Sequence, residues 1–107
     1  MKSRSEILNM ARETIHSVAP EATVKLYGSE ARGDSSADSD MDFLVILPME
    51  RGADFRRKER EITEALLFDV ELETGVEMSP YVVPLDWWTN HPNSEYKYNV
   101  ENEGILL

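Results

Sequence analysis

The chain has 107 residues, 41% of them hydrophobic, and a formal net charge of -10, which predicts one folded domain, residues 1–107, with a single core. Such a charge disfavours direct nucleic-acid binding and suits a basic protein partner or a cation held by carboxylates. The sequence has no cysteine, no apolar run near the roughly 20 residues that span a membrane and no secretory signal in its opening MKSRSEILNM, which predicts a cytoplasmic protein without disulfides or membrane contact.

The first half of the chain predicts a helix followed by two strands. Ser3 and Glu6 have the spacing of a capping box, and apolar residues at helical spacing continue to a stop at Pro20. A short alternating strand, ATVKLYG, ends at Gly28. The next strand, MDFLVILP, is apolar at every position over residues 43–47, which predicts that both of its faces are covered.

The second half predicts a long helix, a third strand and a further helix. The long helix, DFRRKEREITEALLFDVELETG, has Gly75 as its C-terminal cap. Pro80 in the third strand, VEMSPYVVP, cannot donate a ladder hydrogen bond and so belongs at a sheet edge or a bulge. The further helix is expected over residues 94–102. This order of elements predicts an α/β (α+β) domain with a small mixed β-sheet packed by helices. The expected buried stripe of the long helix is Phe55, Ile62, Leu66 and Val70.

Two acidic residues stand at the entrance of the second strand. Asp40 and Asp42 share one face, with Cα atoms roughly 6.6 Å apart by strand rise. Carboxylates so close repel each other and desolvate poorly, so we expect a raised pKa for at least one of them. A shared Mg²⁺ removes that penalty, because it takes one or two carboxylates together with phosphate oxygens and water.

A candidate phosphate site precedes this acidic pair. Gly28 and Ser29 follow a strand directly, and a glycine allows a ligand to approach the backbone closely. A helical turn over SEAR would offer free N–H groups to an anion, with Arg32 adding a cation. Ten residues, 30–39, separate the predicted phosphate site from the predicted metal site, and metal-assisted nucleotidyl transfer requires both.

Structural interpretations of the same residues remain open. Asp40 and Asp42 alternatively form a solvated turn before a strand, although the glycine-rich segment beside them makes this the weaker interpretation. Arg32 alternatively forms a salt bridge with a neighbouring acidic residue. Trp87 and Trp88 are interpreted as lid or core packing rather than as a platform for base stacking.

The sequence resembles the motif of polymerase-β-like nucleotidyltransferases. The resemblance lies in the Gly28–Ser29 pair, the ten residues that follow it and the Asp40–Asp42 pair. The longer pattern GSEARG…SDSDMDFLVIL, continuing to the terminal NVENEGILL, is similar to the minimal nucleotidyltransferases that act as antitoxins beside HEPN-domain toxins. This resemblance implies the polymerase-β-like nucleotidyltransferase fold. It also implies that Gly28 and Ser29 bind the phosphates of a nucleotide and that Asp40 and Asp42 ligate Mg²⁺.

The superfamily also supplies a third carboxylate from the next core strand, which ligates metal and deprotonates the acceptor hydroxyl. Here Glu77 is the only acidic candidate, and it shares a strand face with Ser79. The resemblance therefore assigns Glu77 as a third metal ligand and general base. Alternatively, Glu77 is an ordinary exposed strand residue and the site has only two carboxylates.

The resemblance implies a Mg²⁺-dependent enzyme that transfers AMP from ATP to a hydroxyl, a tyrosine of a cognate HEPN toxin. A single domain leaves the acceptor to bring its own binding surface, which favours a folded protein over the small substrate of an aminoglycoside-type adenylyltransferase. The alternative is a non-catalytic antitoxin that neutralises the toxin by occlusion. The negative charge suits either, because a basic RNA-binding surface is what an acidic inhibitor would cover.

Overall fold

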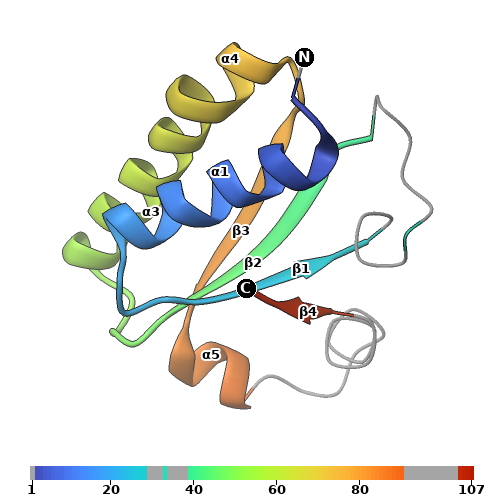
Figure 1. Cartoon of the computed structure of the whole chain (residues 1–107). Coiled ribbons are helices and arrows are strands. Elements are labelled where there is room, and N and C mark those ends of the chain that lie inside the picture. Colours follow the sequence, from blue (N-terminus) through green and yellow to red (C-terminus); the bar gives the residue numbers. More distant parts are fainter. Residues whose placement is uncertain (1, 29–32, 34–38, 91–103) are drawn as a thin grey trace.

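The structure, a computed structural model, describes residues 2–28, 33, 39–90 and 104–107 (Figure 1). The predicted helix at residues 94–102 lies outside this part of the chain. None of the described helices is long and apolar enough to cross a membrane. The elements are α1 (Arg4–Val18), β1 (Thr23–Tyr27), β2 (Met41–Leu47), α3 (Ala53–Leu66), the π-helical turn η1 (Leu67–Glu71), α4 (Leu72–Thr74), β3 (Met78–Pro84), α5 (Leu85–Asn90) and β4 (Ile105–Leu106).

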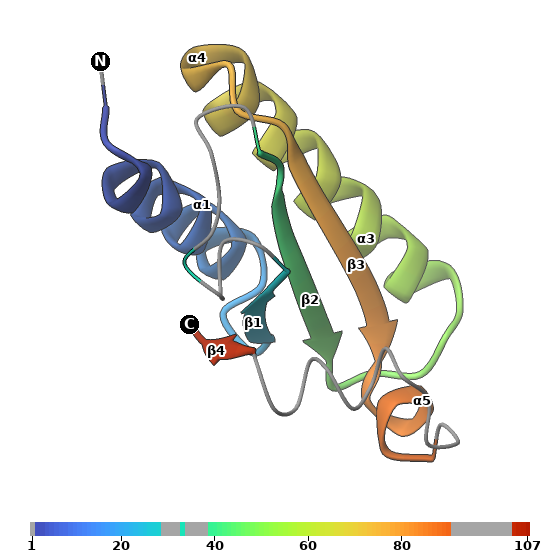
Figure 2. The ribbon, with the colours of Figure 1, turned by 90° about the vertical axis from the view of Figure 1, so that its right-hand side faces the viewer.

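A mixed sheet with the order β3-β2-β1-β4 forms the centre of the molecule. Strands β1 and β2 are antiparallel, β2 and β3 are parallel, and β4 pairs antiparallel with the other side of β1. In Figures 1 and 2, α1 and α3 lie together beside the sheet, and α5 follows the end of β3. The predicted small mixed sheet packed by helices is confirmed.

Helix α1 begins and packs as its sequence predicts. The Ser3 hydroxyl accepts a hydrogen bond from the Glu6 backbone N–H at 3.2 Å, and the Glu6 carboxylate accepts one from the Ser3 N–H at 3.4 Å. This reciprocal capping box satisfies donors that the first helical turn leaves free. Ile7, Ala11 and Ile15 follow at helical spacing and are buried in the core.

Strand β2 is buried on both faces, as its continuous apolar run predicts. Phe43, Val45 and Leu47 belong to the main core with α1 and α3. On the opposite face, Leu44 and Ile46 belong to a second cluster. The remaining buried members of that second cluster are Val83 of β3 and Trp88 of α5.

The long helix contains a π-helical turn that its sequence does not predict. The helix is α-helical to Leu66, continues as η1, and ends in α4 with Gly75 as a left-handed cap at φ 76°. At the end of η1 the N–H of Leu72 bonds to the carbonyl of Leu67, five residues back. The predicted buried stripe is nevertheless confirmed, because Phe55, Ile62, Leu66 and Val70 are all buried.

Strand β3 lies at the edge of the sheet, as Pro80 predicts. The Met41 N–H donates to the Glu77 carbonyl at 3.0 Å, so the alternation of a parallel ladder turns the N–H groups of 77, 79 and 81 toward β2. Pro80 therefore occupies a position that faces away from β2, where no ladder bond is lost. The sequence did not predict α5 or the two-residue β4.

Candidate active site

Three chain segments meet at one end of the sheet. Strand β1 runs antiparallel to β2, so its last residues lie beside the start of β2, and the parallel β3 also starts there. The register pairs Asp42 with Tyr27 on one side and with Ser79 on the other. The mixed sheet thus brings Gly28, Asp42 and Glu77, which are far apart in the sequence, to the same end of the fold.

Asp40 and Asp42 flank a core residue and point away from it. Met41 between them and Phe43 after them are buried in the main core, whereas Asp40 is exposed and Asp42 is half-buried. Burial raises the pKa of Asp42 above its ordinary value, and the charge of Asp40 raises it further. The expected raised pKa is therefore present, with desolvation as the larger cause and repulsion as the smaller.

Gly28 fits closely against the Asp42 side chain. Its φ of +76° lies in the left-handed region, and a Cβ at this position would stand 2.7 Å from Asp42 Oδ2. Both the backbone angle and the close approach require glycine. The structure therefore places the first residue of the predicted phosphate site in contact with one residue of the predicted metal site.

Glu77 points toward Asp40. The charge of Asp40 is the largest of the effects that raise the pKa of Glu77, and a hydrogen bond between the two side chains follows. A hydrogen bond between two carboxyl groups needs one proton between them. The Glu77 side chain is exposed, but it is not turned away from the acidic pair. We call Asp40, Asp42 and Glu77 the carboxylate cluster.

Two residues that the sequence did not indicate support this cluster. The Arg4 guanidinium donates to the Ser39 carbonyl at 2.9 Å, which ties the start of α1 to the residue before Asp40. The Glu71 carboxylate of η1 accepts a hydrogen bond from the Met78 N–H at 2.9 Å. No sequence motif indicates either contact, and the first contact joins residues 35 apart in the sequence.

Residues 8–105 match the sequence model of the nucleotidyltransferase domain family. The chain belongs to this family. No curated protein matches the sequence at a significant level. Structures similar to this nucleotidyltransferase domain include a toxin–antitoxin with AMP-PNP, at TM-score 0.61 and 16% identity over 92% of this chain and 69% of that one. Another is a tyrosine-to-alanine mutant of the toxin–antitoxin MntA-HpeT, at TM-score 0.54 and 18% identity over 100% and 72% of the two chains. Their likeness establishes the expected nucleotidyltransferase fold.

The donor set of this nucleotidyltransferase domain suits a magnesium ion. Carboxylate oxygens are the hard ligands that Mg²⁺ prefers, and Glu77 lies near enough to Asp40 for the charge of Asp40 to raise the pKa of Glu77. Within the described ranges, no group of three acidic, histidine or cysteine side chains is arranged to hold a metal ion. Mg²⁺ commonly takes only one or two carboxylates and completes its shell with phosphate oxygens and water, so two members of the carboxylate cluster are sufficient.

The other predicted nucleotide-binding residues of the domain, Ser29 and Arg32, lie outside the described residues. Of the two tryptophans, Trp88 is buried in the second cluster, which confirms packing as its role. Trp87 is half-exposed, and its ring meets that of Tyr81 edge to face with centroids 5.8 Å apart.

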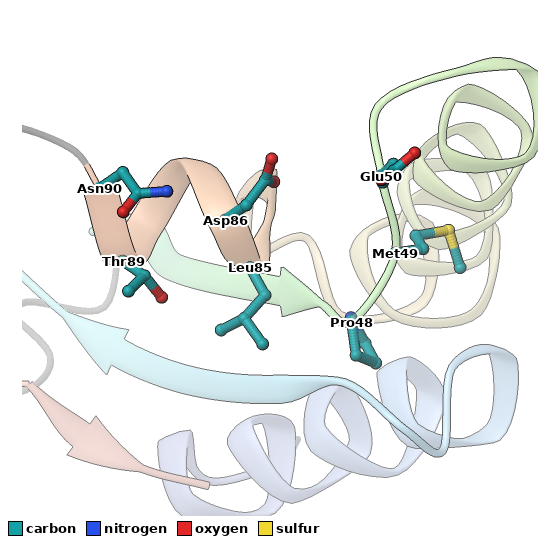
Figure 3. Close-up of a pocket in the computed structure, with 7 residues that line it drawn as sticks. All are labelled: Pro48, Met49, Glu50, Leu85, Asp86, Thr89 and Asn90. Carbon is teal, nitrogen blue, oxygen red and sulfur yellow. The ribbon is translucent and has the colours of Figure 1, made fainter.

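A cavity of about 420 Å³ lies at the opposite end of β2 from the carboxylate cluster (Figure 3). Its walls are the loop that follows β2 and the helix α5. Because β2 extends from Met41 to Leu47, this cavity is roughly 20 Å from the cluster by strand rise. It is therefore not the space in which a ligand of the carboxylates would sit. The lining residues are Pro48, Met49, Glu50, Leu85, Asp86, Thr89 and Asn90.

Proposed function

We propose that this nucleotidyltransferase domain transfers AMP from ATP to a tyrosine hydroxyl of a HEPN toxin, with Mg²⁺, and so acts as an antitoxin. The observation that carries the proposal is the carboxylate cluster beside Gly28, in a chain that belongs to the nucleotidyltransferase domain family. Like-charged side chains gathered at one end of a sheet weaken the fold unless a ligand uses them.

In this proposal Gly28 lets the phosphates approach the backbone, and Ser29 and Arg32 hold the triphosphate. Asp40 and Asp42, with Glu77, hold Mg²⁺, which when bound supplies charge neutralisation to the phosphate oxygens. The acceptor oxygen attacks the α-phosphorus as the bond to the bridging oxygen breaks and pyrophosphate leaves.

Glu77 takes the proton of the acceptor hydroxyl in the same scheme. A general base must be ionised to accept a proton, and a bound Mg²⁺ favours the ionised form of a carboxylate beside it. Because the side chain is exposed, a hydroxyl carried on the surface of a partner protein has access to it.

A toxin as acceptor is supported by two observations. Two of the structures with this fold are toxin–antitoxin structures, one of them with AMP-PNP, an ATP analogue. The net charge of -10 also favours a partner with a basic surface, such as the RNA-binding surface of an RNase toxin.

The test uses purified chain, purified HEPN toxin, Mg²⁺ and ATP labelled at the α-phosphate. We expect label on the toxin with the wild-type chain, none with Asp42→Asn, and wild-type transfer with Asp69→Asn, which changes an exposed aspartate of η1. Toxin that is inhibited without any label would support neutralisation by occlusion instead. Unimpaired transfer by the Asp40→Asn, Asp42→Asn double variant would exclude the metal role.

A further inference from the structure

The π-helical turn η1 ends at Glu71, next to the start of β3. A π turn, with hydrogen bonds between residues five apart, is a rare interruption of an α-helix and occurs frequently at functional sites. In this chain the residue at its end turns a carboxylate toward the edge strand, where Glu71 Oε1 accepts the Met78 N–H at 2.9 Å. The distortion of the helix is thus coupled to a specific contact with β3.

That contact satisfies a backbone group that the sheet itself leaves free. In the parallel ladder Glu77 and Ser79 bond toward β2, so the N–H of Met78 faces the open edge of the sheet. Glu71 covers this edge position. Without it, the first N–H of β3 on that side would lose this acceptor.

Glu77 is consequently held from two sides. On the inner side the Met41 N–H donates to the Glu77 carbonyl at 3.0 Å, and on the outer side Glu71 fixes the next residue, Met78. The Glu77 side chain then meets Asp40. The preceding segment is held as well, because the Val76 N–H donates to the Thr74 hydroxyl at 3.2 Å and the Val76 side chain is buried in the main core.

We propose that Glu71 is a positioning residue, whose hydrogen bond to the Met78 N–H holds the start of β3 so that the Glu77 side chain lies against Asp40. The positioning depends on the hydrogen-bond acceptor of Glu71, while its charge has a separate effect, the smallest of those that raise the pKa of Glu77. Glutamine at position 71 keeps an acceptor of the same length, whereas alanine removes it. In its catalytic part the inference rests on the proposed function.

Hydrogen exchange of two backbone amides tests the positioning without any activity. In Glu71→Ala we expect the Met78 amide to exchange about 10- to 100-fold faster, because its charged acceptor is lost. We expect faster exchange of the Met41 amide as well, since its acceptor belongs to Glu77. Glu71→Gln should restore both. The matched control is Glu73→Ala, which removes an exposed carboxylate of α4 and should leave both amides unchanged.

A kinetic comparison separates positioning from a general effect on stability. We expect Glu71→Ala to lower kcat for AMP transfer about 10- to 100-fold with the KM for ATP nearly unchanged, and Glu71→Gln to recover most of the rate. Unaltered exchange at Met78 or Met41 in Glu71→Ala would overturn the inference, as would a glutamine variant that behaves like alanine. A wild-type chain that transfers no AMP would refute the proposed function alone, and the exchange data would still decide the role of Glu71.

Discussion

Replacement of Gly28 by alanine should damage the active site more than it damages the fold. The φ of +76° costs an alanine roughly 1–2 kcal/mol, and its Cβ would stand 2.7 Å from Asp42 Oδ2. The carboxylate can relieve that contact by leaving its rotamer, which adds about 0.5–1.5 kcal/mol. We therefore expect the free energy of unfolding to fall by about 1.5–3.5 kcal/mol. Transfer should fall about 100-fold, because Asp42 is displaced by around an ångström.

Gly75→Ala is the matched control for this prediction. Gly75 has the same φ of 76°, but among the described residues nothing lies within 4 Å of the place that an alanine Cβ would take, so alanine there bears the backbone strain without a contact. Urea unfolding should show a loss of about 1–2 kcal/mol for the control, and transfer should stay within a few-fold of wild type. If both variants lost the same stability and kept the same activity, the contact between Gly28 and Asp42 would have no role in the site.

Three further predictions concern charged and phosphate-binding groups. The raised folded-state pKa values of Asp42 and Glu77 contribute stability to the metal-free protein that is fully present below the unfolded values near about pH 4 and is lost as pH rises through the folded values. Urea unfolding against pH should show this contribution, and Asp42→Asn should reduce it. Glu77→Gln should slow transfer by about 10²–10⁴-fold and spare ATP affinity, so a matching loss of affinity in calorimetry would contradict its role as base. Arg32→Ala should weaken ATP binding by roughly 1.5–3 kcal/mol, against about 0.5–1.5 kcal/mol for Ser29→Ala. Equal and small losses of affinity in the two variants would favour the interpretation that Arg32 forms a structural salt bridge.

The sequence was sufficient to predict features that depend on local patterns. The capping box of Ser3 and Glu6, the edge position of β3 and the burial of β2 on both faces follow from spacing, from one proline and from an unbroken apolar run. Strand alternation also predicted that Asp40 and Asp42 share one face of their strand, because side chains two residues apart point to the same side.

Features that depend on contacts between distant segments could not be predicted. The π turn leaves the apolar spacing of Ile62, Leu66 and Val70 undisturbed, so periodicity alone does not reveal it. The contact of Glu71 with Met78 requires the side-by-side placement of a helix end and a strand start. Strand β4 has only two residues, too few for an alternating pattern to be recognised.

The alternation of β2 also has a consequence for how the protein acquires its activity. A slip of β2 by one residue would turn Asp42 into the main core and Phe43 out of it, because side chains on a strand alternate. Such a misfolded form would exchange the apolar side chains of the two clusters, with Leu44 and Ile46 in the main core, and would bury the Asp42 carboxylate there. The cost of burying that carboxylate disfavours the slipped register, so the register that keeps Asp42 out of the main core also places the acidic residues of the active site. Deletion of a single residue within Met41–Leu47 should for the same reason remove stability and catalysis in one step.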